Sequence, residues 1–566
     1  MPDNATAIFR RARDFLIEQR CDYERAWRDF AWPRLQTFNW ALDWFDEIAR
    51  KNDRTALRIV GDEGLDERIS FDDLRRRSNS LAQHLRGLGL RRGDRILVML
   101  GNVPRLWEFM LAAIKLGCPI VPTTTLMTTV DLRDRVDRGA VRAVVTEPMY
   151  AERFDGAGGA LLRMLTHGSV AGWQTLPAAA AEMEEFDREG ATAATDPLLL
   201  YFTSGTTAKP KLVAHTQVSY PIGHLSTMYW LGLKPGDVHL NLSSPGWAKH
   251  AWSSFFAPWN AEATVVMLQA GRFDPAQLLQ EIARCEVTSF CAPPTVWRSL
   301  IQLPLAETQV KLRELLSAGE PLNSEVISHV RKVWGLTIRD GYGQTETTLQ
   351  IGNFPGQPVK LGSMGRPAPG YRINLLDTDG VPAEEGEISV SLAEQPLPVM
   401  PGYLDDPERT RAVMSHGHYH TGDIASRDAD GYFTYVGRND DVFKSSDYRI
   451  SPFELESLLI EHDAVAEAAV VPSPDAKRLS VPKAFIVLAK GHAPSRETAH
   501  SILRFVRTRC SPFNRSRRIE FADLPKTLSG KIRRVQLRTS ELGRPAGARR
   551  TYEYWEEDFP EFARTT

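Results

Sequence analysis

Apolar residues recur along this chain at two spacings, and the clearest example lies between residues 96 and 145. The run 96–100, Ile-Leu-Val-Met-Leu, is a continuous apolar stretch of strand length. The apolar positions that follow repeat at the spacing of one helical face, closed by Gly117: Leu106, Phe109, Met110, Ala113 and Ile114. Short apolar runs then stand at 120–121 and 143–145. This pattern predicts strand-helix-strand units and therefore an α/β fold.

The same alternation continues further along the chain. Strand-like runs stand at 198–200, 239–242, 264–268 and 287–291, whereas 153–195 shows little pattern and is predicted to be a variable surface segment. A break at 365–370, Gly-Arg-Pro-Ala-Pro-Gly, is followed by two runs typical of antiparallel strands, 386–392 and 432–436. We expect a large multi-layer N-terminal α/β domain with a β-rich subdomain.

The last part of the chain, from about Asn439, has a pattern of its own. It predicts a helix over 452–461, a hairpin of 465–471 with 482–488, and a helix over 498–509, which together make a compact α+β domain. Ser451, Pro452 and Glu454 form a capping box with proline at the first helical position. Glu454 is therefore predicted to cap this helix.

Composition and charge narrow the range of partners. Lys and Arg total 69 against 71 Asp and Glu, a net charge of −2, so no basic field attracts nucleic acid or anionic membrane. No stretch approaches the roughly 18 consecutive apolar residues of a membrane span. The five cysteines are widely spaced without a C-x-x-C pair, which argues against a disulfide framework and a zinc site. We expect a cytoplasmic, soluble protein that binds small molecules, and the sequence leaves its oligomeric state open.

Four polar clusters accompany these elements. The first, 201–211, reads Tyr-Phe-Thr-Ser-Gly-Thr-Thr-Ala-Lys-Pro-Lys and follows a buried strand, so a loop rich in hydroxyls, amides and positive charge leaves a sheet edge, as suits polyphosphate. The others are 340–347 with 317–321 before it, 420–423 with 437–449 after it, and 524–534. Each alone could be an ordinary surface turn.

In this order, the four clusters resemble the core motifs of the adenylate-forming superfamily, and within it the chain looks like an AMP-forming acyl-CoA synthetase of the medium-chain type. The resemblance runs over nearly the whole chain. It implies an N-terminal domain, 1–437, that binds ATP and the acyl group, and a mobile C-terminal domain, 438–566. It also implies that ATP, Mg2+, coenzyme A and a small carboxylic acid bind, and that Asp440 is the hinge.

The resemblance assigns the nucleotide site residue by residue. The phosphate loop would comprise Thr203, Ser204, Gly205, Thr206, Thr207, Ala208, Lys209, Pro210 and Lys211. The adenine would be bordered by Gly319, Glu320 and Pro321 and stacked on Tyr342, within the segment Asp340, Gly341, Tyr342, Gly343 and Gln344. Thr345 would touch the α-phosphate, Glu346 would hold Mg2+, and Asp423 with Arg438 would bind the ribose.

Lys531 is the catalytic lysine that the resemblance implies, together with Glu346 and Thr203. A carboxylate that attacks the α-phosphate of ATP is a weak anionic nucleophile approaching a polyanion, so positive charge and positioning must supply the catalysis. An exposed lysine in a basic turn is the alternative for Lys531. The later attack by the thiol of coenzyme A needs no catalytic cysteine, because the adenylate is already activated.

The sequence identifies the residues of the acyl pocket less clearly than those of the nucleotide site. The resemblance places Trp247, His250 and Gly343 at the acyl pocket, although aromatic residues at such spacing are also typical of plain core. Tryptophan stands at the position of Gly343 in acetate-specific relatives, so the glycine favours a longer chain, and we expect a short-to-medium aliphatic or simple aromatic acid.

Coenzyme A would contact Ser446, Asp447 and Arg449, and Asp447 stands where relatives generally have glycine. A basic run at Arg515, Arg517 and Arg518 suits phosphates of coenzyme A or a solvated surface almost equally.

Three functions remain open from the sequence. The first is an ATP-dependent carboxylate-CoA ligase. The second, motivated by Asp447, is a stand-alone adenylating enzyme that passes the acyl group to an amine or a carrier-protein thiol. The third is an adenylate-binding protein without catalysis, which the presence of Lys531 and Glu346 argues against.

Overall fold

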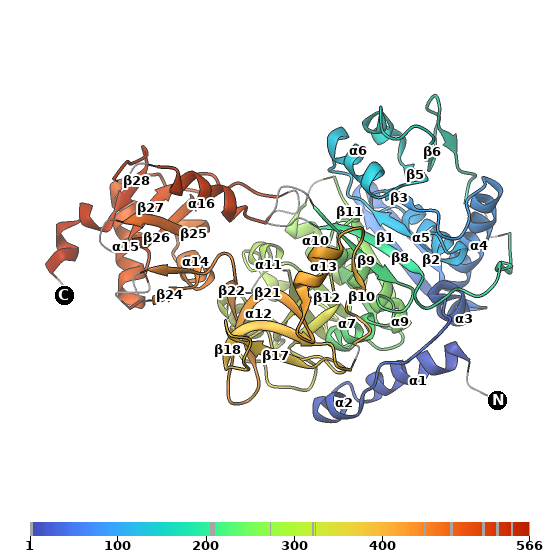
Figure 1. Ribbon diagram of the computed structural model, residues 1–566, viewed down its shortest axis with the longest axis horizontal. Coiled ribbons are helices and arrows are strands. Elements are labelled where there is room, and N and C mark those ends of the chain that lie inside the picture. The colour runs from blue at the N-terminus through green and yellow to red at the C-terminus, as the bar shows by residue number, and fades with distance from the viewer. Residues whose placement is uncertain are drawn as a thin grey trace. The chain divides into compact units, whose positions relative to one another are not determined.

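The chain divides into two units (Figure 1). The computed structural model describes residues 4–179, 182–203, 210–271, 273–319, 322, 324–394, 396–445, 448–475, 479–511, 515–527, 531–544 and 547–564, with the backbone alone for 448, 449, 479, 563 and 564. Unit 1 comprises Met1–Ile373, Ser389–His420 and Asp428–Phe433, and unit 2 comprises Asn374–Ile388, Thr421–Arg427 and Thr434–Thr566. The predicted domain boundary at 437–438 stays a prediction.

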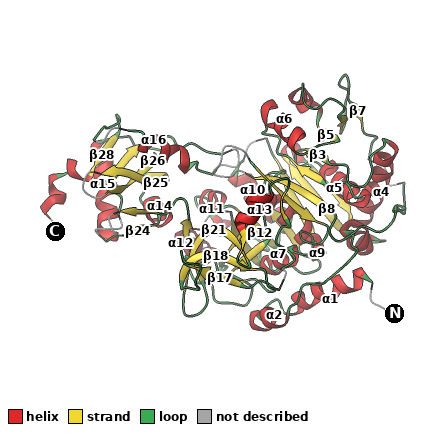
Figure 2. Cartoon of the chain, viewed as in Figure 1, coloured by secondary structure: helices red, strands yellow, loops and turns green. Residues whose placement is uncertain are grey.

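Unit 1 contains two large sheets (Figure 2). Within the described residues, the first has eight strands in the order β19 (Gly402–Tyr403), β9 (Lys211–Thr216), β8 (Pro197–Thr203), β4 (Ile120–Pro122), β3 (Ile96–Met99), β5 (Ala143–Thr146), β6 (Leu162–Leu165) and β7 (Gln174–Thr175). The second has nine, in the order β16 (Arg366–Pro367), β15 (Leu349–Gly352), β14 (Ile338–Gly343), β13 (Glu314–Ala318), β12 (Ser289–Ala292), β10 (Val238–Asn241), β11 (Thr264–Gln269), β1 (Thr55–Gly61) and β2 (Asp66–Ser70). Most neighbours in both sheets are parallel, as the strand-helix-strand pattern predicts.

Helices connect these strands and cover the sheets. They are α3 (Asp46–Ala49), α4 (Phe71–Gly87), α5 (Pro104–Leu116), α6 (Thr129–Arg138), α7 (His224–Leu231), α8 (Ala248–Ala251), α9 (Ala257–Asn260), α10 (Pro275–Arg284), α11 (Pro294–Leu300), α12 (Ser324–Trp334) and α13 (Pro407–Val413). Helix α5 shows why the sequence folds this way. Pro104 starts it at a position where no backbone N–H is needed, and Gly117 ends it in the left-handed conformation at φ 75°.

Two parts of unit 1 differ from the sequence-based expectations or extend them. The N-terminal segment, for which no element was predicted, forms α1 (Ala5–Glu18) and α2 (Tyr23–Asp29). The segment 153–195 is more than a variable surface segment, because it adds the strands β6 and β7 to the edge of the eight-stranded sheet. Buried Phe9 and Leu16 hold α1 against the body of the unit, and they lie a helical repeat of seven residues apart.

A third sheet contains the runs predicted as the β-rich subdomain. Its order is β17 (Ile373–Leu376), β18 (Glu385–Ser391), β21 (His418–Arg427) and β20 (Met414–Ser415), with β22 (Phe433–Arg438) paired to β21.

Among its described residues, unit 2 carries a smaller sheet and three α-helices. The sheet has the order β25 (Val465–Asp475), β26 (Leu479–Leu488), β27 (Arg518–Phe521) and β28 (Glu553–Trp555), beside the ribbon of β23 (Phe443–Ser445) and β24 (Tyr448–Ile450). The helices are α14 (Pro452–Ile460), α15 (Arg496–Arg509) and α16 (Arg534–Leu542). Ser451 caps α14 by accepting a hydrogen bond from the backbone N–H of Glu454. The predicted α/β fold with a smaller α+β part is confirmed.

Candidate active site

The carboxyl ends of parallel strands meet at one edge of the nine-stranded sheet. Strands β13 and β14 run parallel, with Ala318 opposite Gly341, so Gly319 and the segment that begins at Tyr342 leave the sheet at the same edge. The parallel strands β10 and β12 end there too. Ligands of open α/β sheets bind at this edge, outside the carboxyl ends of the strands. Glu320 and Pro321 lie outside the described residues.

The predicted phosphate loop joins two antiparallel strands of the other sheet. Thr203 at the end of β8 is paired with Lys211 at the start of β9, so both stand at the mouth of the hairpin. The carbonyl oxygen of Pro210 accepts a hydrogen bond of 2.7 Å from the Arg138 guanidinium. The other predicted loop residues, Ser204, Gly205, Thr206, Thr207, Ala208 and Lys209, lie outside the described residues.

One tyrosine links the predicted phosphate loop to the predicted magnesium ligand. The Nζ of Lys211 donates to the Oη of Tyr403 at 3.3 Å, and this hydroxyl donates to Oε1 of Glu346 at 3.0 Å. The same ammonium lies 5.1 Å from the centre of the Tyr403 ring. Tyr403 reaches this place because β19 pairs with β9, with Tyr403 opposite Val213. Sequence reasoning missed Tyr403, which no local motif identifies.

The loop that carries Thr345 and Glu346 is fixed from both sides. Buried His215 on β9 makes a 2.7 Å hydrogen bond with the carbonyl oxygen of Thr345, and Tyr419 donates to the side-chain oxygen of Gln344 at 2.7 Å. Burial lowers the pKa of His215 to about 4, although the Thr345 carbonyl opposes this shift, so the ring is neutral near pH 7 and its Nε2–H is the donor. The backbone N–H of Met400 donates to the Glu346 carbonyl at 2.8 Å.

Asp340 is half-buried within β14. Loss of hydration raises its pKa from 3.8 to about 7, while hydrogen bonds from the backbone of Gly341 and Leu322 and the charge of Lys249 act against the rise. Gly341 permits a close approach, since a Cβ there would lie 2.5 Å from the indole of Trp230. Tyr342, which follows, is half-buried on the same strand.

Gly343 has a packing role in this structure. A Cβ on Gly343 would lie 2.2 Å from the carbonyl oxygen of Thr348 and 2.7 Å from the indole of Trp252. The space beside its Cα is therefore filled by protein atoms, and the idea that the glycine itself leaves room for a longer acyl chain receives no support from this geometry. Its assignment to the acyl pocket stays a prediction.

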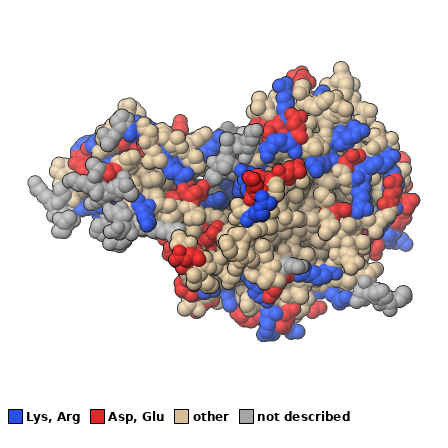
Figure 3. All heavy atoms as spheres, viewed as in Figure 1, with Lys and Arg blue, Asp and Glu red and all other residues tan. Residues whose placement is uncertain are grey.

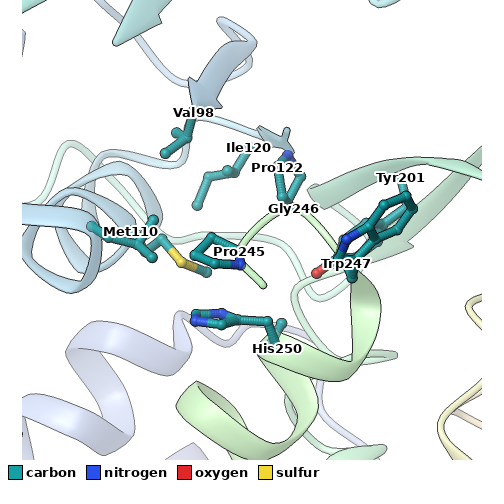
Figure 4. Close-up of a pocket in the computed structure, with 11 residues that line it drawn as sticks. Val98, Met110, Ile120, Pro122, Tyr201, Pro245, Gly246, Trp247 and His250 are labelled. Atoms are coloured by element: carbon teal, nitrogen blue, oxygen red, sulfur yellow. The ribbon is translucent and has the colours of Figure 1, made fainter. Parts of the chain in front are cut away.

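The two other predicted acyl-pocket residues line one cavity (Figure 4). It lies between β3, β4 and β8 of the eight-stranded sheet, helix α5, and the loop that leads from β10 into α8. The residues that line it are Val98, Leu106, Met110, Ile120, Pro122, Tyr201, Pro245, Gly246, Trp247, His250 and Ala251. The wall is mostly apolar and none of these side chains is acidic or is a lysine or arginine.

Gly246 brings the Trp247 loop to this cavity. Its φ is +91°, and a Cβ there would lie 2.2 Å from the backbone nitrogen of Thr124. Only glycine accepts that backbone conformation at such a distance from the neighbouring chain. Gly246 therefore sets how closely the loop approaches the end of β4.

Unit 2 brings together the predicted ribose and hinge residues. Within this unit, the Arg438 guanidinium lies 3.6 Å from Asp423 and 3.7 Å from Asp440. The hydroxyl of Tyr435 donates to Asp423 at 3.2 Å, and the carbonyl oxygen of Asp440 accepts a hydrogen bond from Arg538. Asp423 is buried, and the phenol of Tyr435 and the guanidinium of Arg438 orient its carboxylate.

Lys531 and the predicted coenzyme A residues also belong to unit 2. The side chain of Lys531 is exposed, and its backbone N–H donates to the hydroxyl of Thr527 at 3.1 Å. Ser446 and Asp447 lie outside the described residues, as does the side chain of Arg449, whose backbone pairs with Lys444. These assignments stay predictions.

The basic run at 515–518 is neither a solvated surface nor an open phosphate site. Arg515 and Arg517 form ion pairs of 2.8 and 2.7 Å with Glu556, and Arg507 joins them on the same carboxylate. Arg518 pairs with Asp475 at 2.9 Å. Each arginine of this run is therefore engaged in an ion pair within unit 2, which overturns both expectations for it.

Charges elsewhere are mixed. On the face shown in Figure 3, Lys and Arg side chains lie interspersed with Asp and Glu.

The described residues contain no cluster of three or more His, Cys, Asp or Glu side chains suited to a metal ion. Glu346 fits a Mg2+ ion that is shared with a phosphate, because a carboxylate offers about four lone-pair positions and the described residues give it one hydrogen bond.

A hairpin mouth with a lysine, an acidic residue joined to it through a tyrosine, and the carboxyl edge of a parallel sheet match the site expected of a nucleotide-binding enzyme of the adenylate-forming class. The chain belongs to the AMP-binding enzyme family. The model of that family matches residues 44–404, and the model of the AMP-binding enzyme C-terminal domain matches residues 454–531.

Relatives agree with this membership. The chain is 45% identical to 4-hydroxybutyrate--CoA ligase 1 of Metallosphaera sedula, over 90% of this chain and 91% of that protein. It is 36% identical to the mitochondrial acyl-coenzyme A synthetase ACSM3 of Rattus norvegicus, over 96% and 97% of the two chains. The crystal structure of the anthranilate CoA ligase AuaEII in complex with anthranoyl-AMP superposes with a TM-score of 0.80 at 27% identity, covering 90% and 98%. The predicted resemblance to AMP-forming acyl-CoA synthetases is confirmed.

Two sequence-based expectations also concern the whole chain. All five cysteines are free. Among the described residues, no helix is both long enough and apolar enough to cross a membrane.

Proposed function

We propose that this protein is an ATP-dependent carboxylate-CoA ligase that forms AMP. Membership of the AMP-binding enzyme family supports the class, and the contact from Lys211 through Tyr403 to Glu346 is the observation that carries the proposal. This contact places the ammonium of Lys211 beside the mouth of the predicted phosphate loop, and next to the ammonium it places the carboxylate of Glu346, which suits a metal ion. A polyphosphate and its metal ion require that pair of charges.

The first half-reaction joins the acid to AMP. A carboxylate oxygen of the acid attacks the α-phosphorus of ATP, and pyrophosphate leaves. Lys211 and the backbone around Thr345 hold the phosphates, and Lys531 stabilises the charge that develops between carboxylate and phosphate. Mg2+, held by Glu346, neutralises phosphate charge when it is bound.

The second half-reaction releases AMP. The sulfur of coenzyme A attacks the acyl carbon, the bond to the AMP oxygen breaks, and the thiol proton passes to solvent. The three buried cysteines are poor candidates for a covalent intermediate. Burial raises the pKa of Cys118 to about 12 and that of Cys285 to about 11, and it also raises the pKa of Cys291. Such thiols are not ionised near pH 7 and are weak nucleophiles, which supports direct transfer.

The acid is proposed to be a short-to-medium aliphatic or simple aromatic carboxylic acid. The cavity beside Trp247 and His250 has no ionisable acidic or strongly basic side chain, so a second carboxylate on the substrate would be buried without a partner there. The name of the Metallosphaera relative contains a four-carbon acid, which favours the short aliphatic end of this range.

Release of AMP in the presence and absence of coenzyme A tests the proposal. Purified protein is incubated with ATP, Mg2+ and butyrate, hexanoate or benzoate, and AMP and the thioester are both measured. We expect one thioester per AMP, and at least a hundredfold loss of AMP formation in Lys531→Ala. AMP release without any thioester would instead identify an adenylating enzyme that serves an amine or a carrier thiol. Full activity of Lys531→Ala would refute the role of that lysine.

We also propose a cytoplasmic location, which the five free cysteines support, because reducing compartments keep thiols unpaired. Fractionation of the native cells tests this, and recovery of the protein in an oxidising compartment would contradict it.

A further inference from the structure

The cavity beside Trp247 is lined by two buried polar groups without a hydrogen-bond partner among the described residues, the hydroxyl of Tyr201 and the ring of His250. His250 is 3% exposed and lies on α8, and its Nε2 has no hydrogen-bond partner among the described residues. Figure 4 shows its ring lying across one side of the cavity, below Pro245 and close to Met110. A buried polar atom without a partner is costly and is usually satisfied by water, an ion or a ligand.

The surroundings of the ring are almost entirely apolar. Trp107 packs against it, with 5.6 Å between the ring centres, and Met110 and Ala251 line the cavity next to it. Burial lowers the pKa of His250 to about 3, and burial is the sole cause of that shift, so the ring is neutral near pH 7. A neutral imidazole offers one N–H donor and one acceptor nitrogen and does not attract an anion.

The helical segment that continues from α8 contacts the end of β14, which precedes the predicted reaction site. Two residues after His250 along the chain, Trp252 touches Gly343 at the end of β14, which precedes Thr345 and Glu346. The indole of Trp252 is fixed in turn by a 2.8 Å hydrogen bond to the hydroxyl of Tyr220. Under the proposed function, in which Trp247 and His250 lie at the acyl pocket, an acid whose carboxylate lies by Thr345 would direct its other end toward this cavity.

We propose that His250 binds a hydroxyl group at the far end of the acyl chain, so that the substrates of this enzyme are short hydroxy acids. The inference rests on the proposed ligase function. A hydroxyl both donates and accepts, so it satisfies Nε2 in either tautomer of the ring. A second carboxylate would lack a charged partner, and a plain alkyl chain would leave Nε2 unpaired.

The free space fits a small terminal group. Between the side chains as they stand, the room is on the order of one water molecule, which is also the size of a hydroxyl with its hydrogen bond.

Matched pairs of acids test the inference. Thioester formation is measured for butyrate and its terminal hydroxy derivative, and for pentanoate and its terminal hydroxy derivative, with the wild type, His250→Leu, His250→Asn and Met110→Leu. The last variant alters the same wall without changing its polarity, and melting temperatures confirm that each variant folds. A site that hydrogen-bonds a substrate hydroxyl discriminates strongly against the analogue without it.

We expect the wild type to prefer the hydroxy acid in at least one pair by about tenfold or more in kcat/KM. His250→Leu should lose that preference, mainly by a fall in kcat/KM for the hydroxy acid, whereas Met110→Leu should keep it. His250→Asn should restore part of it, because the amide again offers a hydrogen bond.

Two results would overturn the inference and leave the ligase function standing. One is a wild type that turns over the plain and hydroxy acids equally, and the other is a preference that persists in His250→Leu. Absence of any thioester from every acid would instead refute the proposed function itself, and the inference with it.

Discussion

Replacement of Tyr403 by phenylalanine isolates the contact on which the site depends. The change removes one oxygen and leaves the ring, so the ammonium of Lys211 can keep its place 5.1 Å from the ring centre and β19 can still pair with β9. What is lost is the 3.0 Å hydrogen bond to Glu346 and the 3.3 Å hydrogen bond from Lys211. Both involve an ionised group.

The size of the effect follows from these distances. A hydrogen bond to a charged group contributes about 1.5–3 kcal/mol, and the bond to Glu346 has the length of a good one, whereas the bond from Lys211 is long and adds less. Glu346 is only half-buried, which places the total near the lower end, about 1.5–2.5 kcal/mol. Since 1.4 kcal/mol is a factor of ten, kcat/KM for ATP should fall about ten- to a hundredfold.

The assay is pyrophosphate release at saturating acid, with ATP and Mg2+ varied separately. We expect a higher concentration of Mg2+ to be needed for half-maximal rate, because the carboxylate that would hold the ion is no longer oriented. Tyr432→Phe is the matched control. Tyr432 is also 5% exposed, its hydroxyl also donates a hydrogen bond, to Pro358, and Lys360 also lies over its ring, at 4.8 Å.

An unchanged kcat/KM in Tyr403→Phe, or an equal loss in Tyr432→Phe, would refute the reasoning. The first result would show that the hydroxyl does not organise the site. The second would show that loss of any such tyrosine hydroxyl is enough, through stability alone.

Two further predictions concern Asp340 and Gly246. The pKa of Asp340 is 3.8 in the unfolded chain and about 7 in the folded protein, so between these pH values only the folded protein holds the proton. The protonated carboxyl therefore contributes its full free energy of stabilisation below pH 3.8. That contribution is lost as the pH rises through about 7. The unfolding free energy of the wild type should therefore fall relative to Asp340→Asn by up to about 1.4 kcal/mol per pH unit between pH 5 and 7, measured by denaturant titration, and parallel curves would contradict the raised pKa. Gly246→Ala should lower kcat/KM for the acid by at least about tenfold, since its Cβ would lie 2.2 Å from the backbone of Thr124. Gly236→Ala is the control, because Gly236 has a similar φ of +86° and open space around it. This variant should leave kcat/KM for the acid nearly unchanged. Equal losses in the two variants would attribute the effect to backbone strain alone.

Hydrophobic pattern predicted the central elements well because they are buried on both sides. The runs at 96–100, 198–200 and 264–268 are strands whose side chains are almost all inside, and the helix predicted from Leu106 onward is α5. Such elements carry a strong signal in the sequence itself. Helix α1 carried a usable signal too, with Asn4 as its cap and a buried stripe at Phe9 and Leu16, although no element was predicted there.

The site was only partly predictable, since its contacts join distant parts of the chain. Motif order identified Lys211 and Glu346, but Tyr403 reaches them through a two-residue strand 192 positions after Lys211. No local pattern specifies such a pairing. The prediction for the arginines at 515–518 was wrong for the same reason, because a basic run in the sequence does not reveal that Glu556, some forty positions later, pairs with Arg515 and Arg517.

Gly343 shows a similar limit. The glycine was expected to open the acyl pocket, whereas in the structure it makes room for the Thr348 carbonyl and the Trp252 indole. A glycine signals that a Cβ is not tolerated, but the sequence does not say whether a ligand or the protein itself occupies the space.

The route of the acid's oxygen atoms tests the central claim most directly. The enzyme is given ATP, Mg2+, coenzyme A and an accepted acid whose carboxylate carries oxygen-18, and the products are analysed by mass spectrometry. In an acyl-adenylate route, the attacking carboxylate oxygen stays on phosphorus when the thiol takes the acyl group. The account therefore predicts AMP that carries one oxygen-18 atom, with unlabelled pyrophosphate. Unlabelled AMP, or label in pyrophosphate or in inorganic phosphate, would contradict it.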